Sequence, residues 1–360
     1  MTDWGTIGPD LDDIAAMQAL DPEGMLEHIR HLPAQCWQAW TQLEGWELPP
    51  GHRNRKALAV AGMGGSAIGG DLLRTWAEPV ASVPIVVVRD YRLPAWVGPD
   101  TLVVASSYSG GTEETLAAFA DAVDRGAAVV ALTTGGPLAE MAQAQDVPWV
   151  RIVHRSVPRA AIGASFVSLL RIAHCAGLVP NPKEELDEAL AEMERLREEI
   201  DAAVPEARNP AKQLARALHG RLVVVCGAEH LREVARRWKG QCNENAKVWA
   251  FHEEIPELHH NSIMACDGQP TVNRMVGMVL LTSPDNHPRN RLRFAATEAL
   301  WARYDVAHFQ VEARGTSRLA QMCTALYFGD YVSFYLAMLY GQDPTAMGTI
   351  TYIKQVLAQS

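Results

Sequence analysis

Two short stretches of the chain combine glycines with hydroxyl side chains in a way that suits a phosphate group. The first, GMGGS over residues 62–66, holds Gly64, Gly65 and Ser66 between an expected strand and an expected helix. Glycines let the backbone approach an anion, and the first turn of a helix offers unpaired N–H groups with a partial positive charge. The same residues could simply form a tight turn. They lack the lysine of a nucleoside triphosphate P-loop and do not fit GxGxxG cleanly.

The second stretch, SYSGGT over residues 107–112, supplies three hydroxyl groups beside two glycines. Ser107, Ser109 and Thr112 could surround a tetrahedral anion, whereas capping of the following helix would use only one or two of them. Both stretches follow strands of an expected parallel sheet, so both would lie at its carboxyl edge, where open α/β folds bind ligands. Together they favour a phosphate site over a purely structural role.

Two further motifs carry side chains that could transfer protons. Glu244 lies in NENAK at the end of an expected helix, and His260 lies in ELHHN. Spacing alone favours an exposed helix carboxylate for Glu244. The pair His259-His260 could suggest a metal site, but adjacent histidines rarely converge on one ion and no HxxxH pattern accompanies them. We therefore expect no metal.

Composition limits the partners of such a site. The chain has 360 residues, 48% of them hydrophobic, and a net charge of −10. It has no basic stripe for nucleic acid, so an anionic substrate must be attracted locally by N–H groups and a few cations. Six scattered cysteines without a CxxC pair indicate reduced thiols, and the acidic N-terminus lacks the apolar core of a signal peptide. We expect a cytoplasmic protein without a membrane span, in which the apolar stretch 319–340 is a buried helix.

Short apolar runs alternate with helical patterns, which predicts an α/β fold with parallel sheets covered on both faces. We expect a helical segment over residues 1–50 that packs on the first domain, a phosphate-binding domain over 51–180, a connecting helix within 181–204, and a second domain with C-terminal helices over 205–360. The expected strands are 58–63, 85–88, 102–106, 128–134, 222–229, 276–283 and 308–313. The segments VAGMGGSAIGGDLL and VVCGAEHLREVA look equivalent, so the α/β unit is expected twice.

The order GGS then SYSGGTEET resembles the sugar isomerase (SIS) domain, a flavodoxin-like fold that binds phosphosugars. The resemblance runs from about residue 56 through VPRAAIG around Arg159, then NENAK and ELHHN, to the terminal IK at Lys354. This combination is similar to bifunctional phosphoglucose/phosphomannose isomerases, in which two SIS domains pair within a chain and the active unit is usually a homodimer. It implies interconversion of glucose 6-phosphate and mannose 6-phosphate with fructose 6-phosphate through a cis-enediol, with no cofactor.

The resemblance also implies roles for individual residues. Glu244 would move the proton between C1 and C2, and His260 would open the sugar ring, reaching the site of the partner subunit. Arg159 would steady the enediolate, and Lys354 would hydrogen-bond the sugar near its ring oxygen. Thr345 would leave room for either configuration at C2. Without the resemblance, Arg159 would be a salt-bridged surface residue and Lys354 a solvated charge.

Several alternatives stay open at this point. The family usually has Asn-His-Asn where this chain has His259-His260-Asn261, so either imidazole could open the ring, and we favour His260. A SIS module can also act as a sensor that binds a sugar phosphate without chemistry, commonly beside a DNA-binding domain. The first 50 residues show no clear helix-turn-helix. An isomerase of amino sugars would want an ammonia-supplying domain, for which this length leaves no room.

Overall fold

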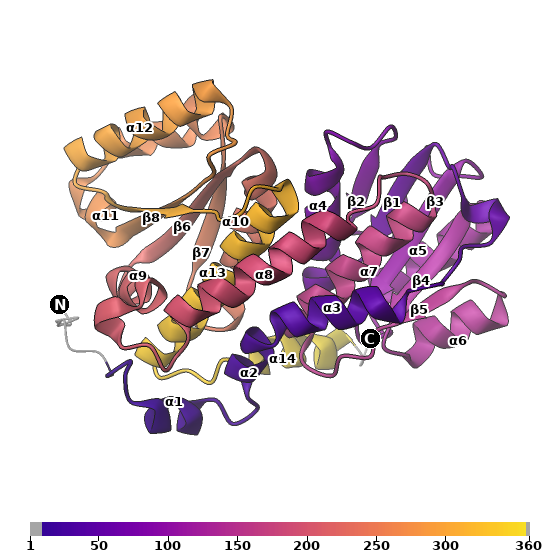
Figure 1. The fold of residues 1–360 in the computed structure, drawn as a ribbon, viewed down its shortest axis with the longest axis horizontal. Helices are drawn as coiled ribbons and strands as arrows, with labels where there is room; N and C mark the ends of the chain where they lie inside the picture. The colour runs from indigo at the N-terminus through magenta and orange to yellow at the C-terminus, as the bar shows by residue number, and fades with distance from the viewer. Residues whose placement is uncertain (1–8, 358–360) are drawn as a thin grey trace. The chain divides into compact units, whose positions relative to one another are not determined.

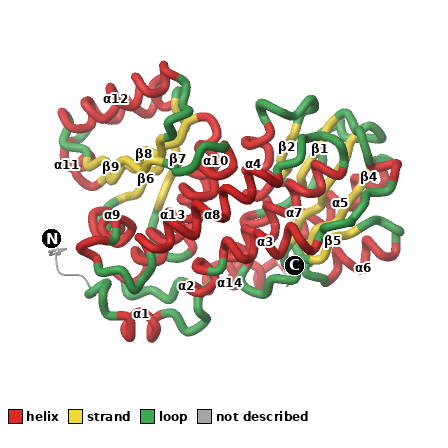
Figure 2. Tube along the Cα trace, in the orientation of Figure 1, coloured by secondary structure: helices red, strands yellow, loops and turns green. Residues whose placement is uncertain are grey.

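The computed structural model describes residues 9–357, which divide into two compact units (Figure 1). The first unit contains His31–Glu194 and Gly315–Cys323. The second unit contains the described residues up to Arg30, together with Arg195–Arg314 and the chain from Thr324 onward. Each unit is built around one parallel sheet between helices (Figure 2).

The first unit has a five-stranded sheet in the order β2-β1-β3-β4-β5, and every pairing is parallel. Every residue of β1, β3 and β4 is buried, because helices cover both faces and leave no side of these strands in water. The strands are β1 (Ala57–Ala61), β2 (Ile85–Val88), β3 (Thr101–Ser107), β4 (Ala128–Thr133) and β5 (Trp149–Arg151). The helices are α3 (Leu32–Gln42), α4 (Gly64–Ala77), α5 (Glu113–Asp124), α6 (Gly136–Ala144) and α7 (Ile162–Cys175).

The second unit has a four-stranded sheet in the order β7-β6-β8-β9, again parallel throughout. This is the order of β2-β1-β3-β4 in the first unit, which agrees with a duplicated α/β unit. The strands are β6 (Leu222–Ala228), β7 (Ala250–Ile255), β8 (Val276–Thr282) and β9 (Ala307–Glu312). The helices are α1 (Ile14–Leu20), α2 (Met25–Arg30), α9 (Pro210–Leu218), α10 (Arg232–Glu244), α11 (Pro270–Met275), α12 (Pro288–Arg303) and α14 (Gly348–Leu357).

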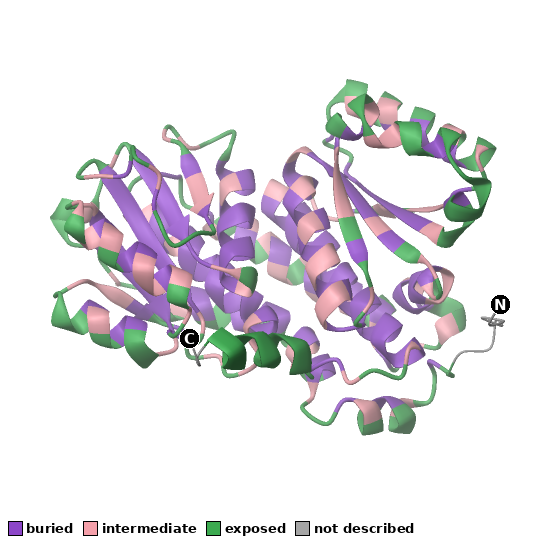
Figure 3. Ribbon diagram, turned by 180° about the vertical axis from the view of Figure 1, so that it is seen from behind, coloured by how far each residue is buried: buried purple, intermediate pink, exposed green. Residues whose placement is uncertain are grey.

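Two long helices carry the chain from one unit to the other: α8 (Lys183–Ile200) and α13 (Arg318–Leu339). Helix α8 lies within residues 181–204. By length and composition α13 could cross a membrane. Its most apolar stretch of 18 residues is, however, entirely buried within the structure (Figure 3). The expectation of a buried helix is therefore confirmed.

The N-terminal segment differs from the expected arrangement, because it is divided between the units at Arg30. Arg30 pairs with Asp201 (Nε–Oδ2 2.6 Å), and its carbonyl accepts a hydrogen bond from Tyr327 at 3.2 Å. These contacts hold the segment before residue 31 to the second unit. Helix α3 instead packs on α7, and Gln35 donates to the carbonyl of Ala160 at 2.9 Å, which keeps α3 in the first unit.

Candidate active site

The two hydroxyl-containing loops meet at the centre of the first sheet. From β1 the chain moves to β2 on one side and returns to β3 on the other, so the strand order reverses between β1 and β3. Residues 62–66 follow β1, and Ser107 ends β3 and is followed by residues 108–112, at the carboxyl ends of these neighbouring strands. The backbone N–H of Tyr108 donates to Ser66 Oγ at 3.1 Å and joins the loops. Ligands of open α/β folds bind at such a topological switch point, which is called the crossing point below.

Glycine is required in the first loop for two different reasons. A Cβ at Gly62 would lie 2.7 Å from the carbonyl oxygen of Ser106, and one at Gly65 would lie 2.8 Å from that of Pro158. These close approaches belong to the packing of the turn. Gly64 is exposed, has φ +49° and would meet nothing within 4 Å, so only its backbone conformation favours glycine. Open space above the first turn of α4 suits the approach of an anion.

The hydroxyl groups of the second loop form hydrogen bonds within the loop, and one of Ser107 and Thr112 donates to the other. Ser107 Oγ accepts from the N–H of Gly110 at 3.1 Å and lies 2.9 Å from Thr112 Oγ1, and Ser109 Oγ accepts from the N–H of Gly111 at 3.3 Å. A serine oxygen that already accepts a hydrogen bond still has its own hydrogen to give to an acceptor such as phosphate. Thr112 is the first residue before α5, but its side chain makes no capping hydrogen bond.

Gly110 allows this loop to lie against the loop that follows β4 and contains Gly135. It has φ +71°, and a Cβ there would fall 1.8 Å from the carbonyl oxygen of Gly135. We expect Gly110→Ala to lower the free energy of unfolding by about 2 kcal/mol or more, because both the backbone conformation and the packing would have to change. Urea denaturation would measure this. Gly98→Ala is the matched control, since a Cβ at Gly98 meets nothing within 4 Å, and an equal loss in both variants would contradict the prediction.

Arg159 lies beside the first loop in the same unit. It belongs to the short 3-10 helix Pro158–Ala161, which packs on the first turn of α4 through the close approach at Gly65. Its side chain is only 1% exposed, which contradicts the alternative of a surface arginine. A guanidinium held in this way keeps its charge and its donor geometry at any physiological pH.

Glu244, Thr345 and Lys354 belong to the second unit. Glu244 is the last residue of α10, and the following turn is fixed by Lys247, whose ammonium donates to the carbonyl of Glu244 at 2.9 Å and also to the carbonyl of Asp343. This brings the turn after Glu244 next to the segment that holds Thr345, which is buried. Lys247 is the last residue of the NENAK motif, but the motif alone does not reveal these contacts. Its φ of 57°, rare for a residue with a side chain, is visible only in the structure.

The two adjacent histidines have different surroundings. His259 Nε2 lies 2.6 Å from Thr297 Oγ1, and its Nδ1 lies 3.2 Å from an N–H of Arg293, so both ring nitrogens are engaged. Burial, and secondarily the charge of Arg293, lower the pKa of His259. His260 is exposed, and no partner of its ring was found among the described residues. This geometry favours His260 as the imidazole available to a substrate.

Glu244 and His260 lie at opposite edges of the second sheet. Helix α10 starts from the carboxyl end of β6 and runs back for 13 residues, about 20 Å, so Glu244 is at the amino edge. His260 follows the carboxyl end of β7, whose six residues span about 20 Å. The second unit of a single chain therefore cannot present both side chains to the same hexose.

Lys354 lies on α14, whose residues are all exposed. The same helix exposes five large apolar side chains, at Ile350, Tyr352, Ile353, Val356 and Leu357. Among the described residues no group of three or more histidine, cysteine, aspartate or glutamate side chains is arranged for a metal ion.

The chain is similar in sequence to known proteins over most of its length. Residues 207–357 match the model of the bacterial phospho-glucose isomerase C-terminal SIS domain. A bifunctional phosphoglucose/phosphomannose isomerase of Caldicellulosiruptor bescii is 38% identical over 336 residues, which cover 93% of this chain and 99% of that protein. The chain belongs to the bifunctional phosphoglucose/phosphomannose isomerase family. A second member, from Aquifex aeolicus, is 33% identical over 84% of this chain and 90% of its own length.

Solved structures agree on the fold of this isomerase family member. A glucose-6-phosphate isomerase like protein from Thermus thermophilus matches with a TM-score of 0.62, at 19% identity, over 95% of this chain and 99% of that chain. Tagatose-6-phosphate ketose/aldose isomerase from Escherichia coli matches with a TM-score of 0.65, at 16% identity, over 95% and 98%. The expected fold of parallel sheets flanked by helices is confirmed.

Proposed function

We propose that the protein interconverts fructose 6-phosphate with glucose 6-phosphate and with mannose 6-phosphate, through a cis-enediol. One observation carries this proposal: two hydroxyl-bearing loops are joined at the crossing point of a parallel sheet. The chain that contains them matches a bifunctional phosphoglucose/phosphomannose isomerase over almost its whole length. The loops suit the 6-phosphate group, because hydroxyl donors and the first turn of α4 face one small region.

In the proposed reaction, the open-chain ketose loses a proton from C1 to the carboxylate of Glu244. The electron pair of that C–H bond forms the C1–C2 double bond, and the C2 carbonyl oxygen gains the negative charge, which Arg159 stabilises. The C1 hydroxyl proton then moves to the C2 oxygen, which leaves the negative charge on the C1 oxygen. Glu244 returns its proton to C2, the C1–C2 double bond supplies the electrons of the new C–H bond, and the C1 oxygen becomes the aldehyde carbonyl of the aldose. The face of C2 that receives the proton decides between the glucose and the mannose configuration. In this proposal, Thr345 lies beside C2.

The ring-opening step is assigned to His260, with Lys354 near the ring oxygen. Because Glu244 and His260 of one second unit are separated by the length of β7, we propose that His260 serves the site of a second copy of the chain. A homodimer is also supported by the apolar side chains that α14 exposes in a single chain. The six cysteines form no disulfide, which supports the cytoplasmic location expected from the sequence.

The decisive experiment incubates the purified, chelator-treated protein with fructose 6-phosphate and identifies the products by NMR. We expect both glucose 6-phosphate and mannose 6-phosphate, at the same rate before and after chelation, because no step above uses a metal. A protein that is stabilised by fructose 6-phosphate but forms no aldose would be a sensor. Loss of activity on chelation, restored by a divalent cation, would contradict the metal-free mechanism.

A further inference from the structure

A polar cavity lies beside the second hydroxyl loop, within the first unit. It has a volume of about 410 Å³ and is lined by Tyr108, Thr134, Arg151, Ile152, Val153 and Arg155. The cavity covers the carboxyl ends of β4 and β5, and Tyr108 connects it to the loop that begins at Ser107. Two of its six lining residues are cations, and none is an acid.

The two arginines of this cavity are available to a ligand. Arg151 and Arg155 are both exposed, and within residues 9–357 neither side chain makes a hydrogen bond or an ion pair. Guanidinium groups without a carboxylate partner bind phosphate oxygens through pairs of parallel N–H groups. In a chain with a net charge of −10, two unpaired arginines beside a cavity form a local positive region.

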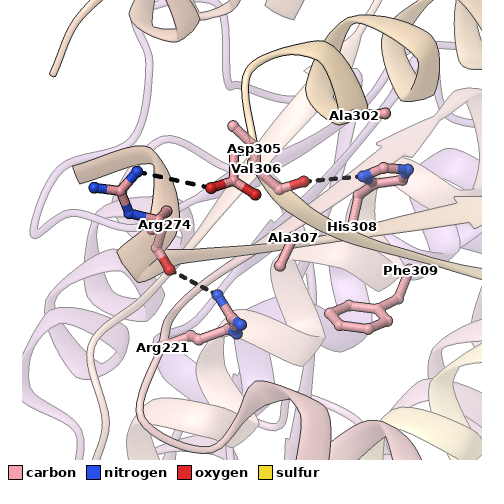
Figure 4. Close-up of a pocket in the computed structure, with 8 residues that line it drawn as sticks. All are labelled: Arg221, Arg274, Ala302, Asp305, Val306, Ala307, His308 and Phe309. Atoms are coloured by element: carbon pink, nitrogen blue, oxygen red, sulfur yellow. Dashed lines mark hydrogen bonds and ion pairs between the residues drawn. The ribbon is translucent and has the colours of Figure 1, made fainter. Parts of the chain in front are cut away.

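A larger cavity in the second unit provides a useful contrast. It measures about 530 Å³ at the amino edge of β6, β8 and β9, and it also contains two arginines (Figure 4). There, Arg274 pairs with Asp305 at 3.7 Å, and Arg221 donates to the carbonyl of Arg274 at 2.7 Å. The cations of that cavity are already engaged, so the cavity beside Tyr108 is the stronger candidate for an anion.

The wall between the cavity and the hydroxyl loop is held in place. The hydroxyl of Tyr108 donates to the carbonyl of His154 at 3.0 Å and accepts from the N–H of Ser156 at 2.7 Å. These bonds tie the segment that carries Arg155 to the hydroxyl loop. The crossing point lies between β1 and β3 and the cavity lies over β4 and β5, so their centres are about two strand spacings, or roughly 10 Å, apart.

We propose that Arg151 and Arg155 form a second phosphate subsite, which receives the far phosphate of a hexose bisphosphate whose first phosphate occupies the hydroxyl loops. This inference rests on the proposed function, because it takes those loops as the site of the sugar 6-phosphate. A ketose esterified at C1 cannot become an aldose, since its C1 oxygen is held by phosphorus. Such a compound would occupy the site without reacting, so the subsite makes the enzyme subject to inhibition by hexose bisphosphates.

Calorimetric titration with fructose 1,6-bisphosphate and with fructose 6-phosphate tests the proposal. We expect the wild-type protein to bind the bisphosphate about tenfold more tightly, and the bisphosphate to inhibit competitively. In Arg151→Gln/Arg155→Gln this preference should disappear. The control Arg289→Gln/Arg291→Gln makes the same change in net charge on α12, outside the cavity, and should keep the preference.

Three results would overturn the subsite: equal affinities in the wild-type protein, an equal loss of both affinities in the cavity variant, or the same loss of preference in the control. Calorimetry reports binding whether or not the bound sugar phosphate reacts. A protein that kept the preference but formed no aldose would therefore refute the proposed isomerisation and leave the second subsite standing.

Discussion

Replacing Glu244 with glutamine is expected to reduce kcat for fructose 6-phosphate by about a thousandfold or more, while fructose 6-phosphate still binds. Glutamine keeps the shape of the side chain but cannot accept the proton from C1, and a positioned acid or base contributes about 10²–10⁴ in rate. The carbonyl of Glu244 would remain bound to Lys247, so the turn after α10 should keep its structure. A coupled assay for glucose 6-phosphate gives kcat, and calorimetry gives the affinity.

Glu184→Gln is a suitable control for this experiment. Glu184 is an exposed glutamate in the first turn of α8, and its replacement removes the same charge. We expect it to keep wild-type kcat. Undiminished turnover in Glu244→Gln would defeat the assignment of the base. A parallel loss of binding and turnover would instead mean that Glu244 supports the structure of the site.

Mixing two inactive variants is expected to restore activity. Glu244→Gln and His260→Ala should each be inactive alone. When subunits exchange freely, half of the dimers are hybrids, and each hybrid has one site with both residues intact if His260 serves the partner subunit. Activity should therefore reach about a quarter of the wild-type value. The prediction follows from the separation of the two residues by the length of β7.

The double variant Glu244→Gln/His260→Ala, mixed with wild-type protein, is the control for that experiment. Its hybrids should contain no intact site, because the wild-type glutamate would face an alanine and the wild-type histidine a glutamine. If instead these hybrids were half active and the mixture of single variants stayed inactive, both residues would serve the site of their own chain. Co-purification of an untagged variant with an affinity-tagged partner variant would confirm that exchange had occurred.

The seven strands expected from the sequence correspond to β1, β2, β3, β4, β6, β8 and β9. For β1, β3 and β4 the apolar runs are continuous, and their bounds agree with the structure within one or two residues. It missed β7, because AFHEEI contains a histidine and two glutamates and lies at a sheet edge, where polar side chains can reach water. It also missed β5, which has only three residues and too little pattern to stand out.

The candidate site was accessible to sequence reasoning where it depends on motifs, and not where it depends on topology. The hydroxyl loops could be found because glycine and serine cluster close to the end of a strand. The opposite placement of Glu244 and His260 could not, since it follows from the direction of α10 and from a strand that the sequence did not reveal. The division of the N-terminal segment depends on the contacts of Arg30 with Asp201 and Tyr327, which lie far away in the chain.

The path of the chain between the two units has a consequence for how the protein is made. The first unit includes residues 315–323, where Thr316 and Ser317 donate their N–H groups to Glu188 on α8, at 2.6 and 3.0 Å, and Leu319 donates to Glu185 at 3.1 Å. A nascent chain on the ribosome that stops at residue 194 has all five strands of the first sheet but lacks these partners. Folding of the first unit can therefore be completed only after most of the second has been translated, whereas independent domains fold in turn from the N-terminus.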